Sequence, residues 1–319
     1  MDWLSTLLLS AAVLLPLLGV AVRLFFKLTS GRVRRIPSMS GKVVLVTGGT
    51  SGIGRETVLA LARAGARVYM TGRSLVGTEK VATELRRISE NKNIFAIQLD
   101  LCDFVSVRKA VVEFLSKETH LHVLINNAGM STGSTLVRLK NGLEETMAAN
   151  HFGPFLLTNL LLDCLERSAP SRIVVVSSMA HQWSRLQLDN LNYERGGFNS
   201  LRAYCDSKMA NILFTTELAN RLRNRGVTVN CLHPGVIATN LFRRVPKLIR
   251  PLLNIFYMPF IKTAWEGAQT SLYLAVSPEV SHVSGHYFAD CRLAACEVFG
   301  VDEAAAKTLW NESAKIIGL

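Results

Sequence analysis

The sequence predicts an α/β fold: a doubly wound, mainly seven-stranded parallel sheet with an N-terminal transmembrane helix before it. Two observations lead there, namely an uncharged run at the start of the chain and short apolar runs that alternate with helical patterns after residue 40. The expected strands are Lys42–Thr47, Arg67–Met70, Ile94–Leu99, His122–Asn126, Arg172–Val176, Thr228–Leu232 and His282–Phe288. Continuous apolar runs such as Ile173–Val176 fit strands that are buried on both faces. We therefore expect one α/β domain over residues 41–319.

The uncharged run extends from Trp3 to Val22. About twenty helical residues at roughly 1.5 Å rise cover about 30 Å, the thickness of a bilayer's hydrocarbon core. Pro16 would bend such a helix but does not forbid insertion. A cleaved signal peptide is the alternative, but it would begin with basic residues, whereas Asp2 precedes this run. Residues 1–22 are therefore predicted to be a transmembrane anchor.

Residues 23–40 form a basic juxtamembrane linker. Its cationic residues are Arg23, Lys27, Arg32, Arg34 and Arg35. Lys and Arg beside a membrane helix tend to stay in the cytosol, so the domain of residues 41–319 is expected to face the cytosol. These side chains contribute to the net charge of +12 and can pair with anionic lipid headgroups, which makes membrane lipids expected partners.

Nucleic acid and metals are not expected partners. The positive charge is not accompanied by a zinc-finger, helix-turn-helix or RNP-like pattern. The six cysteines have no CxxC spacing and the histidines no HExxH pattern, so neither a zinc site nor a disulfide framework is indicated.

A glycine-rich turn directly follows the first expected strand and opens a helical pattern. It reads Thr47-Gly48-Gly49-Thr50-Ser51-Gly52-Ile53-Gly54. Such a turn lets the backbone approach a pyrophosphate and directs the N–H groups of a helix N-terminus at it. A loop that is merely tight is the alternative for a lone match, but here the strand and helix flank it correctly. The turn predicts a Rossmann-type dinucleotide site.

The end of the second strand predicts which dinucleotide binds. An NAD site would normally offer Asp or Glu there, but this chain has Arg73. Together with Arg55, it suits a 2′-phosphate and favours NADP(H), unless both are ordinary solvated surface residues. Asp100, which ends the third strand, is expected near the adenine. Asn127, Ala128 and Gly129 end the fourth strand, at the sheet edge where ligands bind.

A tyrosine and a lysine are candidates for acid–base chemistry. Tyr204 and Lys208 are four residues apart and share a helix face, where an ammonium can stabilise a phenolate. An exposed Lys on an amphipathic helix would explain an isolated match. However, Ser178 ends the strand before this helix and can hold a substrate oxygen, and Asn150 in the preceding helix can hold a proton-relaying water.

Together these motifs resemble the short-chain dehydrogenase/reductase family. The resemblance implies that Ser178 orients the carbonyl or alcohol and that Tyr204 exchanges its proton. Lys208 would bind the nicotinamide ribose and lower the pKa of Tyr204, so both residues would also contact the cofactor, and Asn150 would complete the relay. The residues implied to border the nicotinamide are Pro234, Gly235, Val236 and Thr239.

Several longer stretches resemble the retinol dehydrogenase branch of that family. They are His122–Gly129, Ser168–Val174, Ala203–Cys205, Ser207–Lys208, Ala210–Thr215 and Gly267–Leu272. This branch implies an enzyme of the endoplasmic reticulum membrane that uses NADP(H) on retinal or other lipophilic aldehydes and ketones. A steroid or fatty-aldehyde reductase with the same site is the alternative, and a non-catalytic NADP(H)-binding membrane scaffold is a weaker one. A homodimer is left open.

Two features mark the substrate side. Ser178 and Tyr204 are 26 residues apart, which is longer than in compact family members but similar to the retinol dehydrogenase branch, and the tyrosine motif contains Asp206. Residues 248–261 are apolar but interrupted by prolines. They are expected to form either a lid that dips into the membrane surface or an ordinary core or dimer-interface helix.

Overall fold

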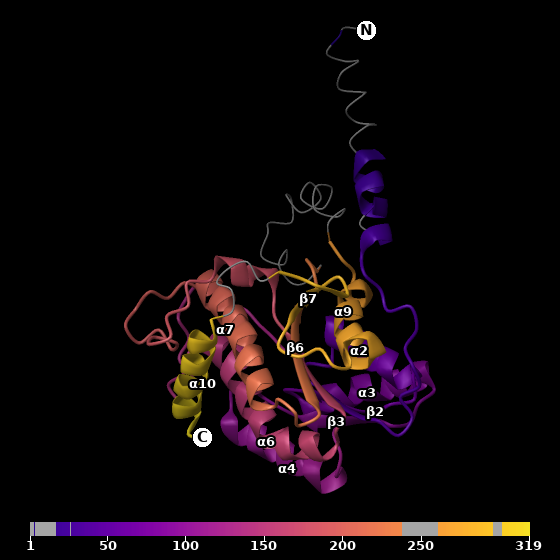
Figure 1. The fold of residues 1–319 in the computed structure, drawn as a ribbon, viewed down its shortest axis with the longest axis horizontal. Coiled ribbons are helices and arrows are strands. Elements are labelled where there is room, and N and C mark those ends of the chain that lie inside the picture. Colours follow the sequence, from indigo (N-terminus) through magenta and orange to yellow (C-terminus); the bar gives the residue numbers. More distant parts are fainter. Residues whose placement is uncertain (1–2, 4–16, 26, 238–260, 296–301) are drawn as a thin grey trace.

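The computed structural model describes residues 3, 17–25, 27–237, 261–295 and 302–319, and it has one eight-stranded sheet with helices on both faces (Figure 1). The strands are β1 Val43–Val46, β2 Arg67–Gly72, β3 Ile94–Gln98, β4 Val123–Asn126, β5 Ser171–Val176, β6 Val227–His233, β7 Tyr287–Ala289 and β8 Arg292–Leu293. The helices are α2 Gly52–Arg63, α3 Leu75–Ser89, α4 Phe104–Lys117, α5 Glu145–Met147, η1 Ala148–Phe152, α6 Gly153–Arg167, η2 Met179–Trp183, α7 Ser200–Arg221, α9 Ala264–Val276, η5 Pro278–Val280 and α10 Glu303–Ile317.

The strand order is β3-β2-β1-β4-β5-β6-β7-β8, and the first seven strands in the chain are parallel. The order reverses between β1 and β4, which creates the switch point where doubly wound sheets bind ligands. The prediction of a Rossmann-type, doubly wound sheet is therefore confirmed.

The count of seven strands was one too few, because β8 pairs with β7 in an antiparallel hairpin. Asp290 and Cys291 form its two-residue turn with φ of 49° and 55°, a left-handed conformation that usually selects Asn-Gly. Asp290 is common in such turns, but Cys291 stands where a glycine is usual, so the turn signal in the sequence is incomplete. The last parallel strand is also shorter than predicted, since it begins at Tyr287 after a left-handed Gly285.

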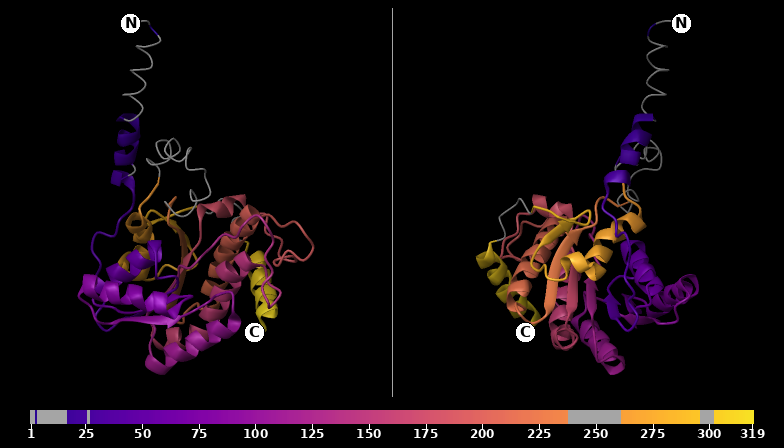
Figure 2. Two further views of the ribbon diagram at one scale, coloured as in Figure 1. Left: turned by 180° about the vertical axis from the view of Figure 1, so that it is seen from behind. Right: turned by 45° about the vertical axis from the view of Figure 1, so that its right-hand side comes forward.

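Two apolar layers hold the helices against the sheet. Along β1, Val43 and Leu45 face the layer beneath α4, α6, α7 and α10. Val44 and Val46 face the layer beneath α2, α3 and α9. Alternate residues of one strand are thus buried on opposite faces, as expected for a sheet covered on both sides. Figure 2 shows the helices around the sheet from behind and after a turn of 45°.

The predicted basic linker is in contact with α9. Arg23 forms an ion pair with Glu266 at 2.7 Å, and the Arg32 guanidinium lies 5.4 Å from the centre of the Trp265 ring. The described residues include no helix that is long and apolar enough to cross a membrane. Residues 4–16 of the predicted anchor lie outside the described residues, so the anchor stays a prediction.

Candidate active site

The glycine-rich turn connects β1 to α2. The side chain of Ser51, the N-cap residue of α2, makes no capping hydrogen bond, and the first turn of the helix contains no acidic residue. The N–H groups and positive dipole end of α2 are therefore available to an anion. At Gly54, an added Cβ would lie 2.3 Å from the carbonyl oxygen of Gly48 and 2.5 Å from Asn127 Nδ2. Only glycine fits this approach.

Hydrogen bonds join this turn to the end of β4. The Thr47 hydroxyl oxygen accepts from the backbone N–H groups of Asn127 at 2.9 Å and Ala128 at 3.0 Å. Asn127 Nδ2 donates back to the Thr47 carbonyl at 2.8 Å. The next residue, Gly129, is close to the predicted relay, because an added Cβ there would lie 3.1 Å from Lys208 Nζ. The predicted cofactor residues of β1 and β4 are thus brought together at the switch point.

The two predicted phosphate-binding arginines differ in their partners. Arg55 pairs with Glu84 at 2.7 Å and with Glu56 at 3.2 Å. Arg73 is exposed just after β2 and forms no ion pair with a described residue, so it is the more available cation. Asp100 is half-buried after β3, where its carboxylate accepts from the Cys102 N–H at 3.0 Å and shapes the turn.

Tyr204 and Lys208 lie on α7, beside the ends of β4 and β5. Lys208 Nζ is 5.6 Å from the centre of the Tyr204 ring and donates to the Val176 carbonyl at 3.0 Å. Ser178 follows β5 as the N-cap of η2 and lies close enough to Tyr204 to affect the pKa of its phenol, while the Ser178 hydroxyl oxygen accepts from the Ala180 N–H at 3.1 Å. The structure therefore places these three predicted catalytic residues close together.

Asn150 lies in η1, a single turn of π-helix between α5 and α6. Such turns occur often at functional sites. Its Oδ1 accepts from the Met130 N–H at 2.8 Å, and its Nδ2 donates to the Met130 carbonyl at 2.8 Å and to the Ser207 hydroxyl at 3.0 Å. The side chain of Asn150 thus links the segment after β4 to α7.

Burial shifts the pKa values of both acid–base groups. It lowers the pKa of Lys208 from 10.5 to about 8, because an ammonium is poorly solvated there. It also raises the pKa of Tyr204, and the nearby Ser178 side chain acts in the opposite direction. The lowering of the Tyr204 pKa by Lys208 stays a prediction, and the Lys208 ammonium donates to the Val176 carbonyl.

The predicted nicotinamide border follows β6. Gly235 has a left-handed φ of 87°, and its N–H donates to His233 Nδ1 at 3.1 Å, so the chain turns sharply after Pro234. The Val236 carbonyl then accepts from the Lys262 N–H at 2.7 Å. Thr239 and residues 248–260 of the predicted lid lie outside the described residues.

The sequence interpretation missed the polar contacts that support the catalytic helix. The Ser177 hydroxyl donates to the Lys208 carbonyl at 2.7 Å, and the Ser207 hydroxyl donates to the Tyr204 carbonyl at 2.8 Å. Asp206 is buried and accepts hydrogen bonds from the segment before α7. The available signal was the polar Asp206-Ser207 pair within an otherwise apolar helical pattern.

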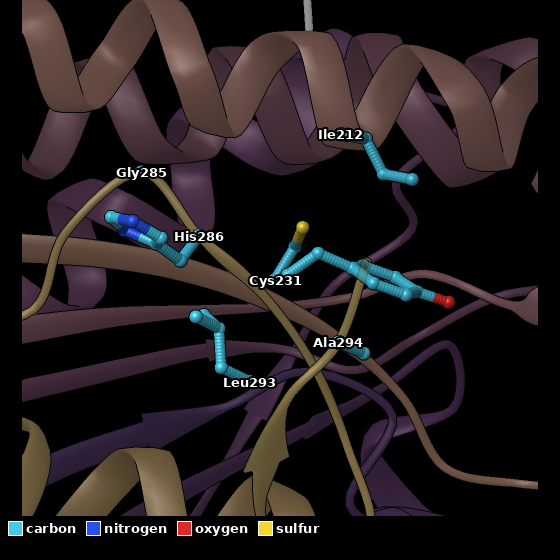
Figure 3. A pocket seen from close by; sticks show the side chains of 7 residues that line it. Ile212, Cys231, Gly285, His286, Leu293 and Ala294 are labelled. Atoms are coloured by element: carbon cyan, nitrogen blue, oxygen red, sulfur yellow. The ribbon is translucent and has the colours of Figure 1, made fainter. Parts of the chain in front are cut away.

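A cavity of about 260 Å³ lies elsewhere, between α7 and the strands β6 to β8 (Figure 3). Ile212, Cys231 and Tyr287 line it, together with residues of the β7–β8 hairpin. None of the predicted catalytic residues lines this cavity, so we assign it no part in the site. No cluster suited to a metal ion occurs within the described ranges.

Comparison with known proteins identifies the family. Residues 42–248 match the sequence profile of the short chain dehydrogenase family. The chain is 44% identical to "Retinol dehydrogenase 14" of Homo sapiens over 97% of this chain and 98% of that protein. It is 43% identical to "Retinol dehydrogenase 11" of Mus musculus over 98% and 97%, respectively.

A solved structure has a similar fold. The Pseudomonas aeruginosa RhlG/NADP active-site complex is 27% identical and has a TM-score of 0.64, covering 79% of this chain and 95% of that one. The chain belongs to the short-chain dehydrogenase family of oxidoreductases and resembles its retinol dehydrogenases.

Proposed function

We propose that this protein interconverts a lipophilic aldehyde or ketone and its alcohol with NADP(H), and that retinal and retinol are its substrate pair. One observation carries the chemistry: Ser178, Tyr204 and Lys208 lie together beside the glycine-rich turn. The choice of substrate is supported by the names of the two relatives, which match nearly the whole chain.

The cofactor residues fit a dinucleotide with a 2′-phosphate. The approach of Gly54 to Gly48 leaves the N-terminus of α2 open to a pyrophosphate. Arg73, without an ion-pair partner in the described residues, can bind an additional phosphate after β2. The RhlG complex with NADP supports the same choice. When bound, NADP(H) supplies or accepts the hydride.

The protein groups supply binding and proton transfer. Since the Ser178 oxygen accepts from the Ala180 N–H, its own O–H can donate to a substrate oxygen. In reduction, Tyr204 gives its phenolic proton to that oxygen as the carbonyl carbon receives the hydride. The Lys208 ammonium then gives a proton to the phenolate and is reprotonated from solvent through a water held at Asn150, and in alcohol oxidation the same steps run backwards.

We further propose that residues 1–22 anchor the protein in the endoplasmic reticulum membrane, that residues 23–40 link the anchor to the catalytic domain, and that this domain, residues 41–319, faces the cytosol. The contacts of Arg23 and Arg32 with α9 support this division, because they would hold the start of the domain close to the membrane. A lipophilic substrate dissolved in that membrane would then enter the site without crossing much water.

A substrate panel tests the proposal. The full-length protein in detergent is assayed with retinal, a steroid ketone and a long-chain aldehyde, each with NADPH and with NADH. We expect the highest kcat/KM for retinal with NADPH. Higher efficiency on the steroid or fatty aldehyde would overturn the substrate assignment, and absence of turnover on every compound would indicate a non-catalytic scaffold.

Tyr204→Phe tests the mechanism in the same assay. The substitution removes the exchangeable proton with little change in volume, so kcat should fall by on the order of 10³-fold. NADPH binding, followed by protein fluorescence, should change little, which separates loss of chemistry from loss of the fold. If kcat were unaltered, Tyr204 would not be the proton donor.

A further inference from the structure

The loop between η2 and α7 contains three buried residues, Leu191, Asn192 and Tyr193, and the last two hydrogen-bond to the segment before α5 and to α7, respectively. The loop lies beside α7 (Figures 1 and 2). Asn192 is 8% exposed and Tyr193 is 4% exposed, although the surrounding loop is largely exposed. Their burial requires specific polar partners, because unpaired polar groups are costly in the interior.

Tyr193 binds the helix of Tyr204 and Lys208. Its hydroxyl donates to Asp206 Oδ2 at 2.8 Å. Asp206 is two positions from each of the proposed catalytic residues, so its side chain leaves α7 on a different face from theirs. The carboxylate therefore acts on them through the helix and not by touching the substrate.

Asp206 is held almost entirely by the loop and the first turn of α7. Its Oδ1 accepts from the Ser184 hydroxyl at 2.7 Å and the Arg185 N–H at 2.8 Å. Arg202 Nε donates to the same Oδ2 as Tyr193, at 3.3 Å. A carboxylate that is 1% exposed is stable only with such a set of donors, so each of them has a defined place.

Asn192 binds the segment that leads to Asn150. Its Oδ1 accepts from the Glu144 N–H at 2.7 Å, and its Nδ2 donates to the Gly142 carbonyl at 3.1 Å. The buried Glu144 carboxylate caps α5 by accepting from the N–H groups of Thr146 and Met147. Since α5 runs directly into η1, a shift of Asn192 would move the turn that carries Asn150.

The backbone at Tyr193 is strained, and contacts from Arg138 and Phe198 hold it in place. Tyr193 has a φ of 54°, a left-handed conformation that a bulky side chain rarely adopts. The Arg138 guanidinium donates to the carbonyl oxygens of Asn192, at 2.5 Å, and of Tyr193, at 3.1 Å. The Tyr193 ring packs edge-on against Phe198. A strained conformation that is held by so many contacts often has a functional reason.

We propose that Asn192 and Tyr193 form a clamp that sets the position of η1, with Asn150, relative to α7, with Tyr204 and Lys208. The proposal rests on the proposed function of these relay residues. A hydrogen bond from Asn150 Nδ2 to the Ser207 hydroxyl, at 3.0 Å, joins η1 directly to α7 between Tyr204 and Lys208. Asn192, Tyr193 and Asp206 are therefore positioning residues and not catalytic ones.

Tyr193→Phe tests the clamp, because it removes only the hydroxyl that binds Asp206. We expect kcat to fall about tenfold, since small misplacements of catalytic groups reduce rates strongly. The KM for NADPH should stay constant, and the solvent deuterium isotope effect on kcat should rise as proton transfer becomes slower than the other steps. A residue that only stabilises the fold would not change this isotope effect.

Tyr69→Phe is the matched control. The Tyr69 hydroxyl donates to Glu118 at 2.7 Å, and Arg67 also binds that carboxylate. This cluster at β2 therefore has the same three groups as Tyr193, Asp206 and Arg202: a phenol, a carboxylate and a guanidinium. We expect it to lower the melting temperature about as much as Tyr193→Phe does, with kcat and the isotope effect unchanged. The clamp would be refuted if Tyr193→Phe behaved like this control.

The double variant Tyr193→Phe/Asn150→Ala shows whether the clamp acts through Asn150. If it does, Tyr193→Phe should lower kcat much less in the Asn150→Ala background than in the parent protein. Independent effects of the two substitutions on kcat would contradict the proposal. Asn192→Ala gives a second variant on the other side of the clamp, with the same expected rise in the isotope effect. If Asn150→Ala and Tyr204→Phe themselves left turnover intact, the proposed function would fail, and this outcome is distinct from failure of the clamp alone.

Discussion

The cofactor half and the substrate half of the site are built in different ways. Around β1 to β4, the shape of the cofactor site comes mainly from backbone groups: Gly54 packs on Gly48, and the Thr47 hydroxyl accepts from backbone N–H groups. Around α7, it comes from side chains far apart in the sequence, such as Asn150 and Ser207. The cofactor half should therefore be sensitive to added volume, and the substrate half to the loss of single polar atoms.

Gly54→Ala should have the largest effect of the three changes considered next. The new Cβ would lie 2.3 Å from the Gly48 carbonyl oxygen, so the turn must move, at a cost of about 3 kcal/mol. If that cost falls on the cofactor site, the Kd of NADPH rises on the order of a hundredfold, which fluorescence titration measures. Gly77→Ala in α3 is the control, since its Cβ would make only ordinary contacts with Ser74. Equal affinities in the two variants would contradict a backbone-defined cofactor site.

Arg73→Ala should have a smaller effect that depends on the cofactor. Loss of one charge-assisted contact at an exposed position costs about 1.5 kcal/mol, so the Kd of NADPH should rise roughly tenfold while that of NADH stays constant. Arg55→Ala should weaken NADPH binding less, because Glu84 and Glu56 already pair with Arg55. A similar loss for both cofactors would show that Arg73 does not recognise the 2′-phosphate.

Lys208→Met should produce the smallest change, and it concerns stability. Because burial lowers the pKa of Lys208 to about 8 in the folded protein, the unfolded chain binds more protons between about pH 8 and 10.5. The charged lysine thus destabilises the fold at neutral pH, and this penalty falls as pH rises through that range. We expect the variant to melt about 3 °C above the parent at pH 7. The gap should narrow by pH 10; a constant gap would mean that desolvation of Lys208 is not the cause.

Much of the site could be predicted because its motifs are contiguous. The turn from Thr47 to Gly54 carries its own strand and helix signals, and Tyr204 and Lys208 are one helical turn apart. The role of Asp206 could not be predicted, since its partners Ser184 and Tyr193 are brought to it only by the path of a loop. The location of Asn150 in a π-helical turn likewise depends on packing between α5 and α6.

The sequence by itself determined the α/β alternation, seven strands of the sheet, the glycine-rich turn and the candidate residues of the relay. These features follow from hydrophobic period and turn chemistry, which act over a few neighbouring residues. Only the tertiary structure decided the β7–β8 hairpin, the contact of the basic linker with α9 and the link from Asn192 and Tyr193 to both relay helices. Each of these features depends on contacts between residues that are distant in the sequence. Local sequence patterns do not indicate which of these residues come into contact when the core packs.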